Sequence, residues 1–106
     1  MRLSLQDLSL LEPLQPHETE LSGAWLANGV HIAGDAVCQR IKWLQEHHLK
    51  HLATDRSGWD RLYRDTRDGR LWELVYLHSE MHGGGPPTLR VLGREVAVGK
   101  YGEYWL

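Results

Sequence analysis

The spacing of apolar residues differs between the middle of the chain and its flanks. After Asp35, side chains suited to a core recur at steps of three and four residues, which is the period of an amphipathic helix. These positions are Val37, Cys38, Ile41, Leu44 and His48. Asp35 itself stands where a carboxylate can cap the free amide groups of a first helical turn. The pattern therefore predicts one clear helix that begins after Asp35.

The flanking segments show the composition and the turn residues of β-strands. Strands are expected at residues 20–26, 30–32, 49–54, 59–65, 70–77 and 88–92. The dipeptides Asn28-Gly29 and Asp68-Gly69 are typical of tight hairpin turns, so each predicts a pair of antiparallel strands. The tail of residues 94–106 is ambiguous, because residues 96–98 suit a strand while a short helix also fits.

Alternation within residues 70–77 indicates how the expected sheet is oriented. Trp72 and Leu74 point to one face, and Glu73 points to the other. The elements together predict an α+β fold in a single domain, with one main helix packed on a mostly antiparallel β-sheet. Residues 1–13 are leucine-rich and end at Pro13, and we expect them to form an N-terminal extension to a domain of residues 14–106.

Composition narrows the class of function. The chain has 106 residues and a formal net charge of −2 without a basic block, so nucleic-acid binding is not expected. No stretch approaches ~18 apolar residues, and the first residues lack the pattern of a secretion signal. The single cysteine, Cys38, excludes an intramolecular disulfide and is expected to pack in the core. The expected location is the cytoplasm.

The segment 79–87, with the sequence SEMHGGGPP, raises the question of catalysis. A His followed by three glycines occurs in the oxyanion loop of some esterases, but the G-x-S-x-G nucleophile motif is absent from the chain. The favoured interpretation is a tight, rigid loop whose glycines permit a positive φ or a close backbone approach. The alternative function is a small metal-dependent hydrolase that uses His78, Glu80 and His82.

Three further histidines, His47, His48 and His51, form H-H-x-x-H at the expected end of the helix. A zinc site of this kind needs a third ligand and usually a glutamate between the histidines. Interaction with the negative end of the helix dipole is sufficient to explain histidines at this place. We therefore expect neither a metal ion nor another cofactor.

Four segments together resemble the immunity protein 27 family. They are LQPHETELSGAW at residues 14–25, GDAVCQRIKWL at 34–44, GWDRLYRD with DGRLWEL between 58 and 74, and SEMHGGGPP at 79–87. The resemblance runs from about residue 14 to residue 92 in one order. It implies a cytoplasmic, non-enzymatic antitoxin that binds the C-terminal domain of a cognate bacterial polymorphic toxin. It does not identify the toxin.

The expected partner-binding residues come from the 59–65 segment and the glycine loop. Five Trp and four Tyr with no Phe suit a protein interface, where aromatic rings anchor and carboxylates orient a partner. The predicted contacts are Trp59, Asp60, Tyr63, Asp65, Glu80 and His82. The same residues could instead brace the hairpin against the loop. A subunit of a larger complex is a further alternative, and the oligomeric state stays open.

Overall fold

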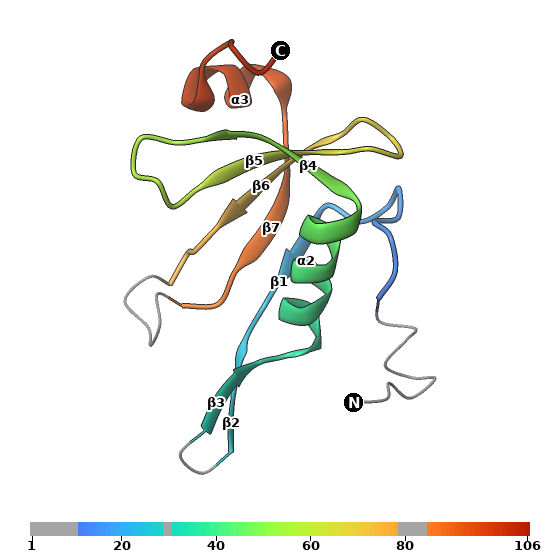
Figure 1. Cartoon of the computed structure of the whole chain (residues 1–106), viewed down its shortest axis with the longest axis vertical. Helices are drawn as coiled ribbons and strands as arrows, with labels where there is room; N and C mark the ends of the chain where they lie inside the picture. The colour runs from blue at the N-terminus through green and yellow to red at the C-terminus, as the bar shows by residue number, and fades with distance from the viewer. Residues whose placement is uncertain (1–10, 29–30, 79–84) are drawn as a thin grey trace.

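The structure is a computed structural model that describes residues 11–28, 31–78 and 85–106. Within these residues, five antiparallel strands form one sheet in the order β1-β7-β6-β5-β4. Their bounds are β1 (Glu20–Ser22), β4 (Leu49–Thr54), β5 (Arg61–Asp65), β6 (Leu71–Val75) and β7 (Thr88–Leu92). A hairpin of β2 (Trp25–Asn28) and β3 (His31–Gly34) projects from one end of the molecule (Figure 1). The predicted single α+β domain is confirmed.

The helix α2 (Ala36–His47) covers one face of the sheet, as the sequence predicts. Asp35 caps its N-terminus, because the Asp35 carboxylate accepts a hydrogen bond from the Cys38 backbone amide at 2.9 Å. Ile41 and Leu44 are buried and pack against strand residues of this face. The buried cluster comprises Leu14, Ile41, Leu44, Leu49, Tyr63, Trp72, Leu74 and Leu89.

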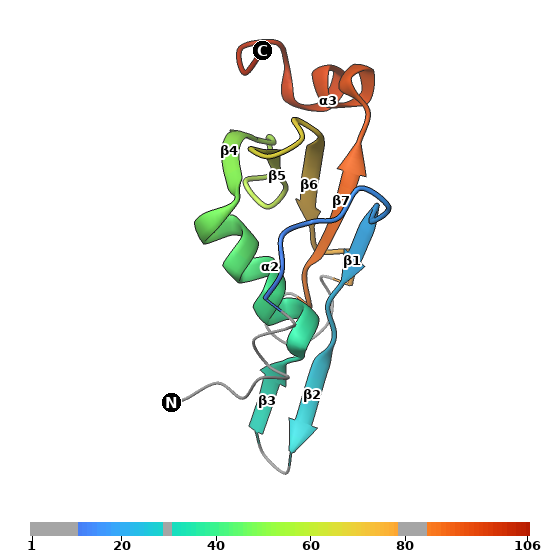
Figure 2. The ribbon, with the colours of Figure 1, turned by 90° about the vertical axis from the view of Figure 1, so that its right-hand side faces the viewer.

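A second helix, α3 (Arg94–Tyr101), settles the ambiguous tail in favour of a helix. Its N-cap is Gly93, and Gly102 ends it with a φ of +81°, a conformation that glycine adopts without strain. Ala97 and Tyr101 are four residues apart, so they lie on one side of the helix and are both buried. Figures 1 and 2 show α3 at the upper end of the sheet and α2 beside its lower part.

Alternation along the strands assigns the two helices to opposite faces. Tyr63 and Trp72 are paired across β5 and β6 and belong to the cluster under α2. Their neighbours Leu62 and Leu71 belong to a separate cluster with α3. This second cluster comprises Ala53, Leu62, Leu71, Ala97, Tyr101 and Trp105. The sheet is therefore covered by α2 on one face and by α3 on the other.

The prediction of one continuous strand over residues 20–26 is wrong. The strand is interrupted at Gly23 and Ala24, so that β1 pairs with β7 while β2 pairs with β3. The Gly23 amide donates to the Pro87 carbonyl at 2.8 Å, and a Cβ at this position would collide with the Cys38 sulfur. Only glycine, which has no Cβ, allows the backbone at residue 23 to lie this close to Cys38 and Pro87. The expected hairpin is confirmed, since Asn28 pairs with His31, although turn residues 29–30 lie outside the described ranges.

The segment that precedes β1 is fastened to α2 by one arginine. The Arg40 guanidinium binds both carboxylate oxygens of Glu18 at 2.7 Å and the carbonyls of Glu12 and Pro13 at 3.0 Å. The hydrogen bond from Arg40 lowers the pKa of Glu18 to about 2, against the opposing effect of burial. The boundary between residues 1–13 and 14–106 stays a prediction, because residues 1–10 lie outside the described ranges. No helix within those ranges is long and apolar enough to cross a membrane.

Candidate partner-binding surfaces

Among the predicted contacts that the structure describes, the most exposed aromatic side chain is Trp59, which lies in the connection between β4 and β5. Its side chain is 60% exposed, and its ring meets Tyr76 edge-on at a centroid distance of 5.9 Å. Leu77, which follows Tyr76 in the chain, is 52% exposed. We call Trp59, Tyr76 and Leu77 the Trp59 surface. An exposed tryptophan with apolar neighbours is typical of the anchor of a protein interface.

The turn that presents Trp59 is held by one carboxylate. Asp55 Oδ1 accepts hydrogen bonds from the Ser57 hydroxyl at 2.7 Å, the Gly58 amide at 3.1 Å and the Asp60 amide at 3.2 Å. Gly58 has a φ of +81°, which the turn requires and glycine permits. Burial alone would raise the pKa of Asp55, but these hydrogen bonds outweigh it and lower the pKa. An ionised Asp55 therefore fixes the direction of the turn.

Asp60, the second predicted contact, belongs to an ionic network on the α3 face. Lys100 Nζ lies 2.7 Å from Asp60 Oδ2 and 2.6 Å from Glu73 Oε2. Glu73 is only 1% exposed, and it also accepts hydrogen bonds from the Tyr101 hydroxyl at 2.7 Å and from Arg90 at 3.1 Å. Lys100 thus ties the turn that carries Trp59 to the C-terminal end of α3.

The ionisation of this network follows from its geometry. Burial opposes a charge on Glu73, but hydrogen bonds from Lys100 and Tyr101 lower its pKa below the usual range. Burial and the neighbouring Glu73 carboxylate raise the pKa of Tyr101, which stays protonated and donates. The sequence interpretation missed this network. The residue that could have indicated the network is Glu73, the one charged residue in the strand Leu71–Val75. That strand is fully buried, and a buried carboxylate requires a hydrogen-bonding or charged partner.

Burial removes two predicted contact residues from the surface. Tyr63 is 4% exposed; its hydroxyl accepts from Gln45 at 2.8 Å, and its ring packs near His51. Asp65 is 1% exposed, and its carboxylate accepts from the Arg67 amide at 2.8 Å where the β5–β6 turn begins. Both lie on the α2 face and act within the fold, so a partner on the surface does not reach them. A strand pattern alone does not distinguish such residues from exposed ones.

The other two predicted contacts, Glu80 and His82, lie outside the described residues. After this segment, Gly85 has a φ of +84°, and a Cβ there would collide with the His78 carbonyl, so glycine is required at position 85. The alternative metal site keeps only His78 within the described ranges. In those ranges, no group of three or more His, Cys, Asp or Glu side chains is arranged to hold a metal ion.

The remaining histidines and the cysteine have local roles. α2 ends at His47, so His51 lies in β4 and not one helical turn further along. The His51 ring nitrogen is 3.0 Å from the Ala53 carbonyl and from the Thr54 hydroxyl. Burial raises the pKa of the Cys38 thiol, which lies 3.6 Å from the Ala24 carbonyl. A protonated thiol in contact with the hairpin suits packing and not nucleophilic chemistry.

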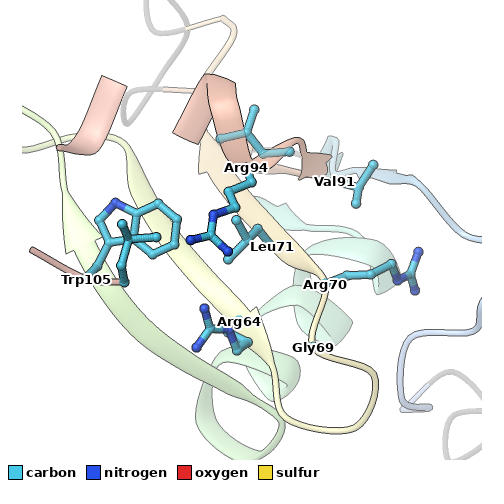
Figure 3. A pocket seen from close by; sticks show the side chains of 9 residues that line it. Arg64, Gly69, Arg70, Leu71, Val91, Arg94 and Trp105 are labelled. Carbon is cyan, nitrogen blue, oxygen red and sulfur yellow. The ribbon is translucent and has the colours of Figure 1, made fainter. Parts of the chain in front are cut away.

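A groove of about 350 Å³ opens on the α3 face near the end of β5 (Figure 3). Its walls are Arg64, Gly69, Arg70, Leu71, Val91, Leu92, Arg94, Trp105 and Leu106. In Figure 3, the Arg94 guanidinium lies between Trp105 and Leu71, Arg64 lies below them, and Arg70 points away. Arg70 is occupied by Asp68 and by the Glu18 and Gln15 carbonyls. We call this site the arginine groove.

The structure is thus a small α+β domain with an exposed tryptophan on one turn and an arginine-lined groove on the α3 face. The model of the immunity protein 27 family matches residues 27–93, more than half of the chain, and the chain belongs to this family. The resemblance seen in the sequence is thereby confirmed over that range. Membership supports an immunity role and implies a protein toxin as the general kind of partner. No curated protein and no solved structure matches the chain.

Proposed function

We propose that this protein is an antitoxin that binds the C-terminal domain of a cognate bacterial polymorphic toxin in the cytoplasm of the producing cell. It acts by binding, without catalysis, and it neutralises the toxin by covering its active site or its substrate path. Family membership is the observation that carries this proposal. The exposed Trp59 on a rigid turn supports it from the structure.

The Trp59 surface supplies the kind of contact that tight binding needs. An interface of ~1,600 Å² with a few central aromatic anchors reaches nanomolar affinity. The Asp55 hydrogen bonds hold the turn before binding, so little conformational entropy is lost when a partner packs on Trp59. Asp60 beside it keeps the turn attached to α3 through Lys100. These residues replace Tyr63 and Asp65 as the expected centre of contact.

Co-expression with the toxin domain encoded by the neighbouring gene tests the proposal. Wild-type protein should restore growth to cells that produce the toxin domain, and the two chains should co-purify as a complex. Trp59→Ala should weaken the complex by about 30-fold or more, which corresponds to ~2 kcal/mol for an interface anchor. Titration calorimetry on the purified chains measures this change.

Leu26→Ala provides the matched control. Leu26 is 57% exposed, close to the value for Trp59, but it lies on the projecting β2–β3 hairpin. This variant should bind the toxin domain like the wild type. Absence of both growth rescue and a complex for the wild-type chain would refute the antitoxin proposal. An equal loss of affinity in Trp59→Ala and Leu26→Ala would leave the antitoxin proposal standing but would contradict a special role of Trp59 as the anchor.

A further inference from the structure

Two of the three arginines that line the arginine groove have no counterion among the residues that the structure describes. The side chains of Arg64 on β5 and Arg94 at the start of α3 make no hydrogen bond or ion pair with any residue that the structure describes. By contrast, Arg40, Arg70 and Arg90 each bind a carboxylate. No Asp or Glu is among the described residues that line the groove. The groove therefore holds two guanidinium groups that no Asp or Glu side chain among the described residues pairs with.

The sheet adds a third positive charge at the same place. Lys50 on β4 is exposed and pairs directly with Arg64 on β5, so the two side chains lie on the same face. Like charges placed opposite each other across a strand pair destabilise a sheet. This arrangement is unfavourable for the isolated chain and becomes favourable when a negative group lies between or beside the two residues.

The walls of the groove indicate which anion fits. Leu71, Leu92 and the buried ring of Trp105 provide apolar contacts beside the guanidinium groups. Guanidinium groups bind carboxylates through paired hydrogen bonds, and neighbouring apolar walls suit the side chains that flank such a carboxylate. A phosphate backbone would need an extended basic track, whereas the free cations that the structure describes at this groove are confined to Arg64, Arg94 and Lys50.

We propose that the arginine groove binds an acidic segment of the partner protein, in which Asp or Glu side chains alternate with apolar ones. This inference rests on the proposed antitoxin function and specifies the chemistry of its partner. α3 connects the groove to the turn that carries Trp59, because Arg94 begins the helix and Lys100 near its end binds Asp60. The helix has eight residues, or about 12 Å, so the groove and Asp60 lie near its two ends.

Charge removal tests the proposal on the complex with the toxin domain. Arg64→Gln and Arg94→Gln should each weaken binding about tenfold, and the double variant should weaken it further. Binding by the wild type should also weaken as salt increases, and the double variant should show a smaller salt dependence. Lys42→Gln is the matched control, since Lys42 is an exposed cation on α2 and its loss should leave binding unchanged.

The outcomes separate this inference from the proposed function. If both arginine variants bind the toxin domain as tightly as the wild type, the proposal for the groove is wrong and the antitoxin function stands. Absence of a wild-type complex would defeat both. Binding of a short DNA duplex or of inorganic phosphate that depends on Arg64 and Arg94, with unchanged toxin binding, would also overturn the acidic-segment proposal. Sedimentation that shows a dimer dependent on these arginines would assign the groove to a second copy instead.

Discussion

The two faces of the five-stranded sheet are closed by different chemistry. The face under α2 is closed mainly by apolar and aromatic side chains, among which Leu44 and Trp72 are fully shielded from solvent. The face under α3 has its own apolar cluster but also buries the carboxylate of Glu73, which Lys100 and Tyr101 hold. Apolar burial stabilises without direction, whereas a buried charge favours one arrangement of its partners.

This difference separates what stabilises the fold from what positions its candidate surfaces. α2 contributes apolar burial, and the arginine groove lies on the opposite face. On that face, Glu73 and Lys100 fix α3, and through Asp60 they also fix the turn that carries Trp59. The comparison leads us to expect that changes on the α2 face alter stability most. Changes to charges on the α3 face should alter stability less and recognition more.

The largest expected effect is on the α2 face, from Trp72→Ala. Trp72 is 0% exposed and packs in the cluster of that face, so its truncation removes apolar burial and leaves a cavity. The free energy of unfolding should fall by about 3–5 kcal/mol. Urea denaturation followed by circular dichroism measures the change. A loss below about 1 kcal/mol would show that this face does not dominate stability.

The second effect concerns the buried charge of the α3 face, tested with Glu73→Gln. Neutralising Glu73 leaves Arg90 and Lys100 without their shared carboxylate, but these two side chains are 39% and 32% exposed and regain water. The expected loss is therefore about 2 kcal/mol, less than for a fully enclosed ion pair. Tyr101→Phe should cost less, because it removes one donor and keeps the ion pairs.

The pH dependence of the same variant checks the cause. The pKa of Glu73 is lowered in the folded protein from an ordinary value of 4.5. Its contribution to stability is present above that ordinary value and is lost as the pH falls through the lowered one. Wild-type stability should thus decline below about pH 4.5, and Glu73→Gln should flatten part of that decline. An unchanged acid profile would contradict an ionised Glu73.

The apolar part of this comparison follows from the sequence, and the charged part does not. The three- and four-residue spacing located α2, and alternation placed Trp72 and Glu73 on opposite faces, because both patterns are local. Strands β4 and β7 have the predicted bounds. The partners of Glu73 are 17 to 28 residues away, and nothing in the local pattern names them. The burial of Tyr63 could not be predicted for the same reason, since it depends on packing against α2, which is distant in the sequence.

A third, smaller effect is expected from Arg40→Gln, which tests how far the stability of the α2 side depends on charge. Arg40→Gln removes the ion pair with Glu18 and the hydrogen bonds to two carbonyls of the preceding segment. The expected loss of stability is about 1 kcal/mol, because the pair is only partly shielded. The pKa of Glu18 is about 2 in the folded protein, so the wild-type advantage should disappear as the pH falls from 4.5 toward 2. Melting temperatures of both forms across this range provide the check.

The smallest expected effect separates a structural arginine from a recognition arginine on the same face. Arg90 binds the buried Glu73, so Arg90→Gln should cost about 1 kcal/mol of stability, reduced by its exposure. Arg64 makes no such contact with the described residues and opposes Lys50, so Arg64→Gln should change stability by less than about 0.5 kcal/mol. Denaturation curves for the two variants, measured beside the wild type, make the comparison direct. If Arg64→Gln lowered the free energy of unfolding as much as Arg90→Gln, the charge of Arg64 would stabilise the fold. Arg64 would then be a structural residue like Arg90, which contradicts a recognition role for the arginine groove.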